Sequence, residues 1–297
     1  MGDCVEASVI IRTLNEARWL PKLLEAISQQ DIDGRLIETV IVDSGSTDDT
    51  LSIAKDHGCR VVHIRKEDFT FGRSLNVGCD AALGRCLIFI SGHCIPVGTR
   101  WLADLIAPLQ EGAIEYVYGR QEGFGPTKYS ERQLFKKYYP MNSQLPRDDI
   151  FCNNANSALL KSAWKEFPFD ESLTGLEDMD LAKRLLAAGR KIGYVAESSV
   201  LHIHDETWKK VKIRYEREAI ALRNIRPEFH VGLPQFIRYF LAGVYWDCRQ
   251  AIKDRVLHKY AIEIVLFRFM QYFGTYCGNN EHRQLSGLQR DAYFYPK

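Results

Sequence analysis

The chain has 297 residues, of which 46% are hydrophobic and 26% are charged, and this composition excludes disordered and fibrous proteins. Its net charge of +1 gives no general reason to expect a nucleic-acid partner. The charge is unevenly divided, however: residues 1–204 carry 23 Lys and Arg against 28 Asp and Glu, and residues 205–297 carry 16 against 10. The C-terminal third is also rich in Tyr, Phe and Trp, which suggests an anionic partner there.

Strands and helices are expected to alternate over the first 90 residues. Short apolar runs predict strands at 8–13, 36–43, 59–65 and 85–90. Helices are expected between them: one with Leu20, Leu23, Leu24 and Ile27 at helical spacing, one capped by Ser46 or Thr47 with Asp48 and Asp49 in its first turn, and one at 75–83. Continuous apolar strands linked by helices predict a parallel sheet covered on both faces.

Polar residues follow several of these strands directly. Thr13–Asn15, Asp43 and Ser91–His93 all lie at carboxyl ends, where open parallel sheets bind ligands, so we expect them to meet at one rim. The turn RTLNEAR after the first strand contains no glycine, which excludes the dinucleotide fingerprint, and no P-loop motif occurs. The negative charge of a bound diphosphate would therefore be neutralised by a metal ion or by basic side chains.

The second half of the chain is less regular. Strands are expected at 114–119, 152–160, 191–196 and 199–204, and the pattern from residue 205 onward is helical. No segment is apolar over the ~20 residues that a membrane span requires.

Two later motifs carry chemically capable side chains. In LTGLEDMD, Thr174 and Glu177 fit a capping box, which would place Glu177 and Asp178 in the first turn of a helix. A carboxylate there could act as a general base, although acids in first turns are also common without any function. On a strand, His202 and His204 would share one face, as metal ligands beside His93 or as a packing pair.

Six motifs occur in an order that resembles family 2 glycosyltransferases of the GT-A fold, above all rhamnosyltransferase-like members that build bacterial surface polysaccharides. They are VIIRTLNEARWLPKLLEAI, IVDSGSTDDT, GRSLNVGCDAALGRCLIFIS, VYGRQ, NNANSALLKSAWKEFPFDESLTGLEDMDLAKRLLAAG and VLHIHDETW. The resemblance covers about residues 7–225. It implies a Rossmann-like α/β fold with a mostly parallel central sheet and a helical C-terminal extension.

The resemblance also implies a division of the chain into domains. Residues 1–204 would form the GT-A catalytic domain, with a nucleotide-binding half of about 1–98 and an acceptor half of about 99–204. Residues 205–297 would form the helical, basic and aromatic C-terminal region.

Site residues are assigned from the same resemblance. Asp178 matches the family's catalytic base, with Glu177 beside it, and would deprotonate an acceptor hydroxyl in an inverting displacement. The predicted nucleotide-sugar-binding residues are Thr13, Asn15, Glu16, Asp43, Ser44, Arg73, Asn76, Ser91 and Arg120.

The metal site departs from the family pattern. Where the family usually has D-x-D, this chain has Ser91-Gly92-His93, and His202 or His204 matches the histidine that often completes the coordination of a divalent cation, Mn²⁺ or Mg²⁺. Neutral imidazole suits Mn²⁺ but brings no charge, so either these histidines hold the ion or Arg73 and Arg120 offset the diphosphate instead.

The expected partners are a nucleotide sugar, with UDP or dTDP favoured, and a glycan or lipid-linked acceptor, without nucleic acid. The absence of a signal-peptide pattern predicts a cytoplasmic enzyme. Residues 205–297 would either provide peripheral contact with the inner face of the membrane, or pack on the catalytic domain or form a dimer interface. Two alternatives remain: a catalytically inactive nucleotide-sugar-binding module and a nucleotidylyltransferase-like enzyme.

Overall fold

The computed structural model describes residues 5–281 and 293–295. The chain divides into two compact units. The first comprises residues up to Glu122, Tyr139–Ser172 and Glu177–Ile203, and the second comprises Gly123–Tyr138, Leu173–Leu176 and the chain from His204 onward.

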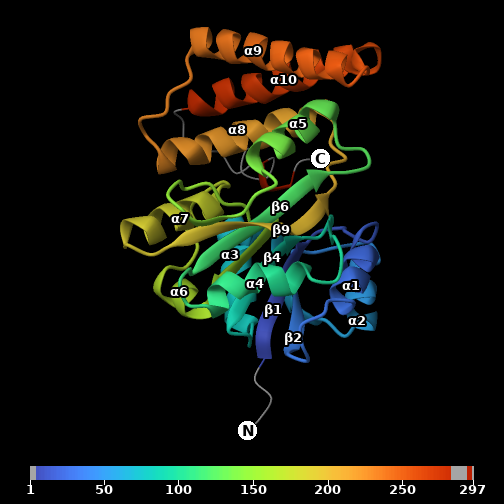
Figure 1. Ribbon diagram of the computed structural model, residues 1–297, viewed down its shortest axis with the longest axis vertical. Helices are drawn as coiled ribbons and strands as arrows, with labels where there is room; N and C mark the ends of the chain where they lie inside the picture. Colours follow the sequence, from blue (N-terminus) through green and yellow to red (C-terminus); the bar gives the residue numbers. More distant parts are fainter. Residues whose placement is uncertain (1–4, 282–292, 296–297) are drawn as a thin grey trace. The chain divides into compact units, whose positions relative to one another are not determined.

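The first unit is built on a nine-stranded sheet (Figure 1). Its strands are β1 (Val5–Thr13), β2 (Leu36–Asp43), β3 (Arg60–His63), β4 (Cys86–Ser91), β5 (Cys94–Pro96), β6 (Tyr116–Gly123), β7 (Gln144–Arg147), β8 (Asn156–Leu160) and β9 (Ile192–His202). The order is β3-β2-β1-β4-β8-β6-β9-β5, and β7 also pairs with β9. Strands β1 to β4 pair in parallel, as the alternation predicts, whereas β8 runs antiparallel to both β4 and β6.

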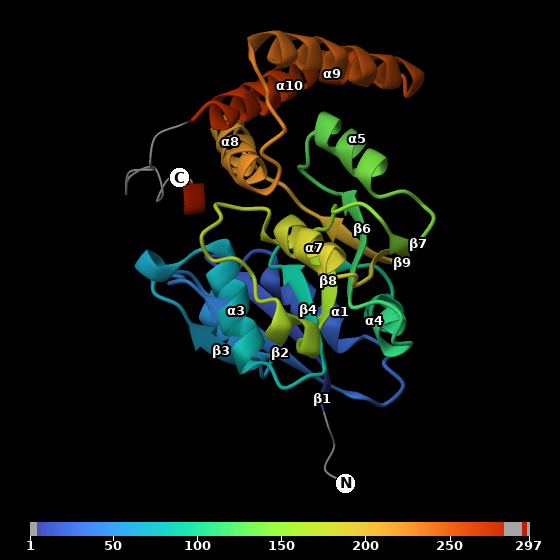
Figure 2. The ribbon, with the colours of Figure 1, turned by 90° about the vertical axis from the view of Figure 1, so that its left-hand side faces the viewer.

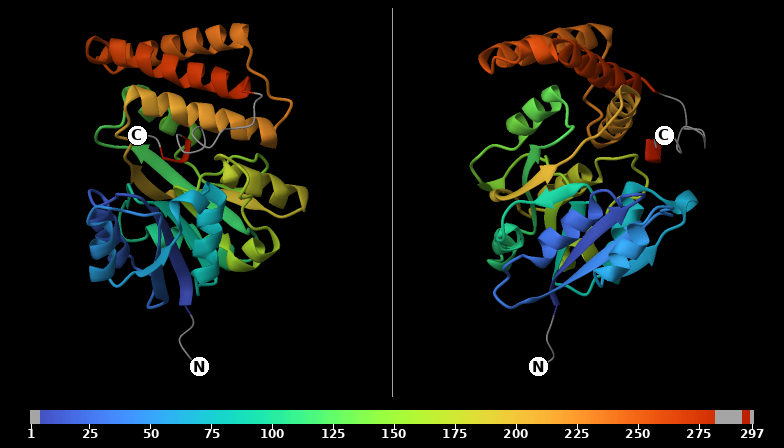
Figure 3. Two further views of the ribbon diagram at one scale, coloured as in Figure 1. Left: turned by 180° about the vertical axis from the view of Figure 1, so that it is seen from behind. Right: turned by 90° about the vertical axis from the view of Figure 1, so that its right-hand side faces the viewer.

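Helices cover both faces of the sheet. They are α1 (Leu20–Ser28), α2 (Thr50–Asp56), α3 (Phe71–Ala81), α4 (Trp101–Gln110), α6 (Lys161–Glu166) and α7 (Glu177–Ala187), with a short 3₁₀ turn at Lys66–Asp68. Figure 2 shows α3 lying across β2 and β3, and the right-hand view of Figure 3 shows α1 and α2, in blue, on the opposite face.

Burial of β1 explains this layering. Ala7, Val9 and Ile11 pack into the core cluster that also contains α1 and α4. Ile10 points to the other face, where a Cβ on Gly78 of α3 would lie only 2.5 Å from its Cγ2. Both faces of the strand are therefore buried, which removes the polar alternation that a half-exposed strand would show.

Strand register brings the carboxyl ends together. Thr13 lies opposite Asp43, Arg12 lies opposite Ser91, and Asp43 lies opposite His63. The predicted rim is therefore formed, since the ends of β1, β2 and β4 stand side by side.

Three of the predicted elements differ clearly from the structure. The two strands expected at 191–196 and 199–204 are one strand, β9, because the joining residues contain no glycine or proline and continue the extended backbone. The helix expected to start after Ser46 or Thr47 begins at Thr50, since Asp43 and Asn15 hold the backbone of residues 45–47 in a turn instead.

The second unit consists of helices: α5 (Tyr129–Tyr138), α8 (Trp208–Ile225), α9 (Leu233–Lys253) and α10 (Leu257–Asn279). Helix α10 packs closely on α8, because a Cβ on Gly274 or Gly278 would collide with the α8 backbone at Lys212 or Glu216. Helices α9 and α10 lie side by side (Figures 1 and 3). Among the described residues, no helix combines the length and the apolar character needed to cross a membrane.

Candidate active site

Asp43 ends β2 and is buried, with 1% of its surface exposed. Its Oδ2 accepts hydrogen bonds from the backbone N–H groups of Gly45 and Ser46, at 2.9 and 3.0 Å. Its Oδ1 accepts from the hydroxyls of Ser46 and Thr13, at 2.5 and 3.1 Å. These four donors match the four lone-pair positions of a carboxylate, so Asp43 shapes the rim whatever it binds.

The turn after β1 is fastened to the turn after β2. Asn15 has a φ of 59°, a left-handed conformation that Asn tolerates better than most residues. Its side-chain oxygen accepts from the Thr47 N–H at 2.8 Å, and its own N–H donates to the Ser46 hydroxyl at 2.9 Å. Ser44 is buried, and its N–H and hydroxyl both donate to the Thr13 carbonyl. Thr13, Asn15, Asp43 and Ser44 are therefore brought together.

Two histidines of the first unit stack at the same rim. The rings of His93 and His202 have their centroids 5.2 Å apart and their planes 28° apart. Nδ1 of His93 lies 3.1 Å from Oε1 of Glu16, and Nδ1 of His202 lies 2.7 Å from Oε1 of Gln121. Oxygens at Nδ1 fix the orientation of both imidazoles and direct the Nε2 lone pair as a ligand atom, which is the usual arrangement around a metal-binding histidine.

His204, the third predicted ligand, belongs to the second unit. There its Nδ1 lies 2.7 Å from Oε1 of the buried Glu131. Arg214 pairs with Glu131 and with Glu206. Burial opposes ionisation of Glu131, but the interactions with Arg214 and His204 lower its pKa to about 2.

The predicted arginines and Ser91 lie in the first unit. Arg73 lies in the first turn of α3 and its side chain is half-exposed, with Nη1 4.0 Å from Asp68. Arg120 lies on β6 and pairs with Glu122. Ser91 ends β4, opposite Arg12 of β1.

Asp178 is a buried carboxylate held by two backbone donors. Its Oδ2 accepts from the N–H of Asn154 at 3.0 Å, and its Oδ1 accepts from the N–H of Met179 at 2.8 Å. Burial, followed by the neighbouring charge of Glu177, raises the pKa of Asp178 to about 7, against the lowering effect of these N–H groups and of Arg12. A carboxyl group with this pKa can take up a proton near neutral pH, as a general base must.

Arg12 is a residue that the sequence analysis missed. It precedes Thr13 on β1, and its Nη1 donates to Oε1 of Glu177 at 3.3 Å and to the carbonyl of Phe71 at 3.2 Å. Its only sequence signal is a charged residue inside an otherwise apolar strand. Asn154 and Gln121 were also missed, although the motifs NNANS and VYGRQ contain them.

The predicted capping box at Thr174 is wrong. Helix α7 begins at Glu177 itself, and the Thr174 hydroxyl donates to the carbonyl of Arg217, within the second unit. Leu176 has a φ of 56°, which is strained for a branched apolar residue and reverses the chain directly before the helix. Glu177 and Asp178 still lie in the first turn, where the dipole favours carboxylates.

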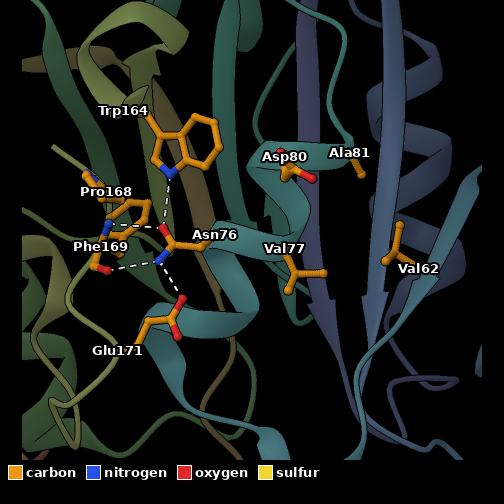
Figure 4. A pocket seen from close by; sticks show the side chains of 9 residues that line it. All are labelled: Val62, Asn76, Val77, Asp80, Ala81, Trp164, Pro168, Phe169 and Glu171. Carbon is orange, nitrogen blue, oxygen red and sulfur yellow. Dashed lines mark hydrogen bonds between the residues drawn. The ribbon is translucent and has the colours of Figure 1, made fainter. Parts of the chain in front are cut away.

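Asn76 lies on α3 and lines a cavity of about 600 Å³ (Figure 4). Its Oδ1 accepts from Trp164 Nε1 and from the Phe169 N–H, and its Nδ2 donates to the Phe169 carbonyl and to Glu171. The cavity is lined by Val62, Asn76, Val77, Asp80, Ala81, Trp164, Pro168, Phe169 and Glu171. Asn76 thus fastens α3 to the segment after α6, and nucleotide binding by this residue stays a prediction.

Comparison of the sequence with known proteins identifies a family. The sequence model described as "Glycosyl transferase family 2" matches residues 8–167. The O-antigen chain rhamnosyltransferase RfbN of Salmonella typhimurium is 28% identical over 224 residues, covering 71% of this chain and 70% of the relative.

Solved structures of glycosyltransferases share the fold. The mannosyltransferase PcManGT from Pyrobaculum calidifontis, in complex with GDP-Man and Mn²⁺, has a TM-score of 0.63 at 15% identity and covers 93% of this chain and 87% of its own. The glucosyl-3-phosphoglycerate synthase of Mycobacterium tuberculosis, with Mn²⁺, UDP and glucosyl-3-phosphoglycerate, has a TM-score of 0.56 at 20% identity, over 74% of this chain and 80% of its own. These likenesses confirm the predicted GT-A fold with its helical C-terminal region.

Proposed function

Because this chain belongs to glycosyl transferase family 2 and is a glycosyltransferase, we propose that it moves a sugar from a nucleotide sugar to a hydroxyl group of a glycan or lipid-linked acceptor. The similarity to an O-antigen chain rhamnosyltransferase supports a role in bacterial surface polysaccharide synthesis. UDP and dTDP are the favoured nucleotides of the donor.

The buried Asp178 is the observation that carries this proposal. Its carboxylate takes the proton from the acceptor hydroxyl, whose oxygen then attacks the anomeric carbon as the bond to the nucleotide diphosphate breaks. One displacement from the face opposite the nucleotide inverts the anomeric centre. Burial and, after it, the charge of Glu177, which pairs with Arg12, keep the pKa of Asp178 high enough for this task.

The leaving diphosphate needs positive charge. His93 and His202 fit a divalent cation, since each imidazole is oriented through Nδ1 by an oxygen of Glu16 or Gln121. A bound Mn²⁺ or Mg²⁺ would stabilise the charge that develops on the leaving group. Arg73 and Arg120 are the alternative source of that charge, and the role of His204 as a further ligand stays a prediction.

The remaining assignments concern the nucleotide and the location of the enzyme. We place the nucleotide at Thr13, Asn15, Glu16, Asp43 and Ser44, with Ser91 beside the diphosphate. Contact between Asp43 and the base requires the Thr13 or Ser46 hydroxyl to turn away, because both donate to that carboxylate. We propose residues 1–204 as the catalytic domain of a cytoplasmic enzyme that works at the inner face of the membrane.

A donor screen with analysis of the product tests the reaction. The protein is incubated with UDP-, dTDP- and GDP-sugars, with Mn²⁺, Mg²⁺ or EDTA and a polysaccharide-repeat acceptor, and the new linkage is examined by proton NMR. The proposal predicts transfer from one donor class with inversion of the anomeric configuration. A product with retained configuration would exclude the single displacement by Asp178.

A further inference from the structure

Helix α9 exposes a stripe of large apolar side chains. Leu233, Ile237, Leu241 and Tyr245 follow one another at intervals of four residues and are 54%, 46%, 59% and 60% exposed. At ~100° per residue this spacing keeps them along one side of the helix, where Ile252, 61% exposed, continues the stripe. Monomeric proteins rarely leave such a continuous apolar surface in water, so it indicates an interaction site.

The acids of α9 and α10 are engaged in hydrogen bonds within the second unit. Asp247 is the single acid of α9 and is 3% exposed, since both its oxygens accept from Arg268 of α10 at 2.7 and 2.8 Å. Glu263 is the single acid of α10, and its Oε1 accepts from the N–H of Tyr129 at 2.7 Å. Asp254, which follows α9, is exposed, but its two oxygens accept from the hydroxyl of Tyr129 and from Gln250.

The exposed charges of α9 are therefore all positive. Arg238, Arg249 and Lys253 are exposed, and Arg238 and Arg249 project between the apolar stripe and a second flank formed by Tyr239 and Trp246. Trp246 is 59% exposed, packs edge-to-face on Tyr245 and lies under the guanidinium of Arg249. Exposed Trp, Tyr and Arg beside aliphatic side chains are typical of helices that lie in a membrane interface.

We propose that this outer face of α9 docks on the surface of an anionic lipid bilayer, with its aliphatic and aromatic side chains in the headgroup region and Arg238 and Arg249 on lipid phosphates. The inference deepens the proposed membrane location and rests on it. A second copy of the chain fits this face less well. A twofold interface would bring the arginines of both copies together in one dehydrated patch, with no acid of α9 available to pair with them.

Sedimentation with lipid vesicles tests the proposal on the full chain. Vesicles of phosphatidylcholine alone are compared with vesicles containing one third phosphatidylglycerol, at low and high salt. The wild-type protein should sediment with the anionic vesicles and be released by salt. Replacing both arginines, Arg238→Gln with Arg249→Gln, should lower binding to anionic vesicles roughly ten- to thirty-fold.

A matched pair of apolar variants isolates the stripe. Leu241 and Leu83 are both 59% exposed, but Leu83 lies in the first unit, outside α9. Leu241→Ser should lower vesicle binding several-fold while Leu83→Ser leaves it unchanged, and unfolding temperatures verify that both variants fold. Equal loss in both variants, or a wild-type protein that ignores anionic vesicles, would overturn the proposal. A wild-type dimer in solution that Leu241→Ser converts to a monomer would show a contact between copies instead.

These outcomes are independent of the chemistry. Vesicle binding by a protein that transfers no sugar would support the membrane-docking surface and contradict the proposed reaction. Transfer of sugar to a soluble acceptor by a protein that does not bind vesicles would support the reaction and contradict the membrane-docking surface.

Discussion

Arg12 and Glu177 form an ion pair across 165 residues of sequence, with Nη1 and Oε1 3.3 Å apart. Arg12 belongs to the last residues of β1, directly before the predicted nucleotide-binding turn, and Glu177 is the first residue of α7, directly before the proposed base. The pair therefore ties the end of β1 to the start of α7. It also lets a charge on β1 act on the protonation of Asp178.

The kcat/KM of sugar transfer should fall as the pH falls through about 7. Asp178 must be ionised to act as a base, and its pKa is raised to that value. Arg12→Gln removes a charge that lowers this pKa, so the acidic limb of the kcat/KM profile should move to higher pH. Arg35→Gln, an exposed arginine paired with Asp33, serves as the control and should leave the limb in place. An unmoved limb in Arg12→Gln would mean that another group titrates.

Glu16 should control metal affinity without touching the ion. Glu16→Gln weakens the acceptor that holds Nδ1 of His93, and loss of such an outer partner typically costs 10- to 100-fold in metal affinity. Calorimetric titration of the nucleotide-bound protein with Mn²⁺ measures this effect, with Glu25→Gln on the exposed side of α1 as the control. Binding of the nucleotide that is equally strong in EDTA and in Mn²⁺ would favour the arginines as the source of positive charge.

Asp43→Asn should destabilise the protein even without a ligand. An amide nitrogen cannot accept the hydrogen bonds that one carboxylate oxygen now receives, so buried donors lose their partners at a cost of about 1–3 kcal/mol. Urea unfolding of the ligand-free protein measures the loss. A variant that is as stable as the wild type, but whose unfolding temperature is not raised by nucleotides, would show that Asp43 acts in ligand binding and not in stability.

The buried pair between Asp247 and Arg268 should be costly to break. Asp247→Ala leaves an unpaired guanidinium between α9 and α10, and the loss of one partner in such a pair costs about 3–5 kcal/mol. Adding Arg268→Met removes the stranded charge and should restore part of the stability. Additive losses in the double variant, measured by urea unfolding, would show that the two side chains act independently.

Sequence patterns predicted the rim because strand alternation fixes which ends of a parallel sheet meet. Thr13, Asp43 and Ser91 come together for that reason. Sequence patterns could not predict the contact of Arg12 with Glu177, which depends on where tertiary packing places the start of α7. Nor could they place the start of α7, because the left-handed backbone of Leu176 has no signature in its side chain. The contact of His204 with Glu131 likewise follows from tertiary packing, since the two residues are 73 positions apart in the sequence.

The kcat of sugar transfer by the Asp178→Asn variant tests the central claim most directly. The variant keeps the volume of the side chain but cannot accept a proton, and Asp180→Asn, on the same helix and paired with Arg184, is the matched control. The proposal predicts a loss of kcat of at least about 10²-fold in Asp178→Asn, nearly unchanged nucleotide binding, and an active control. Transfer at the wild-type rate in Asp178→Asn would contradict the assignment of the base and, with it, the proposed mechanism.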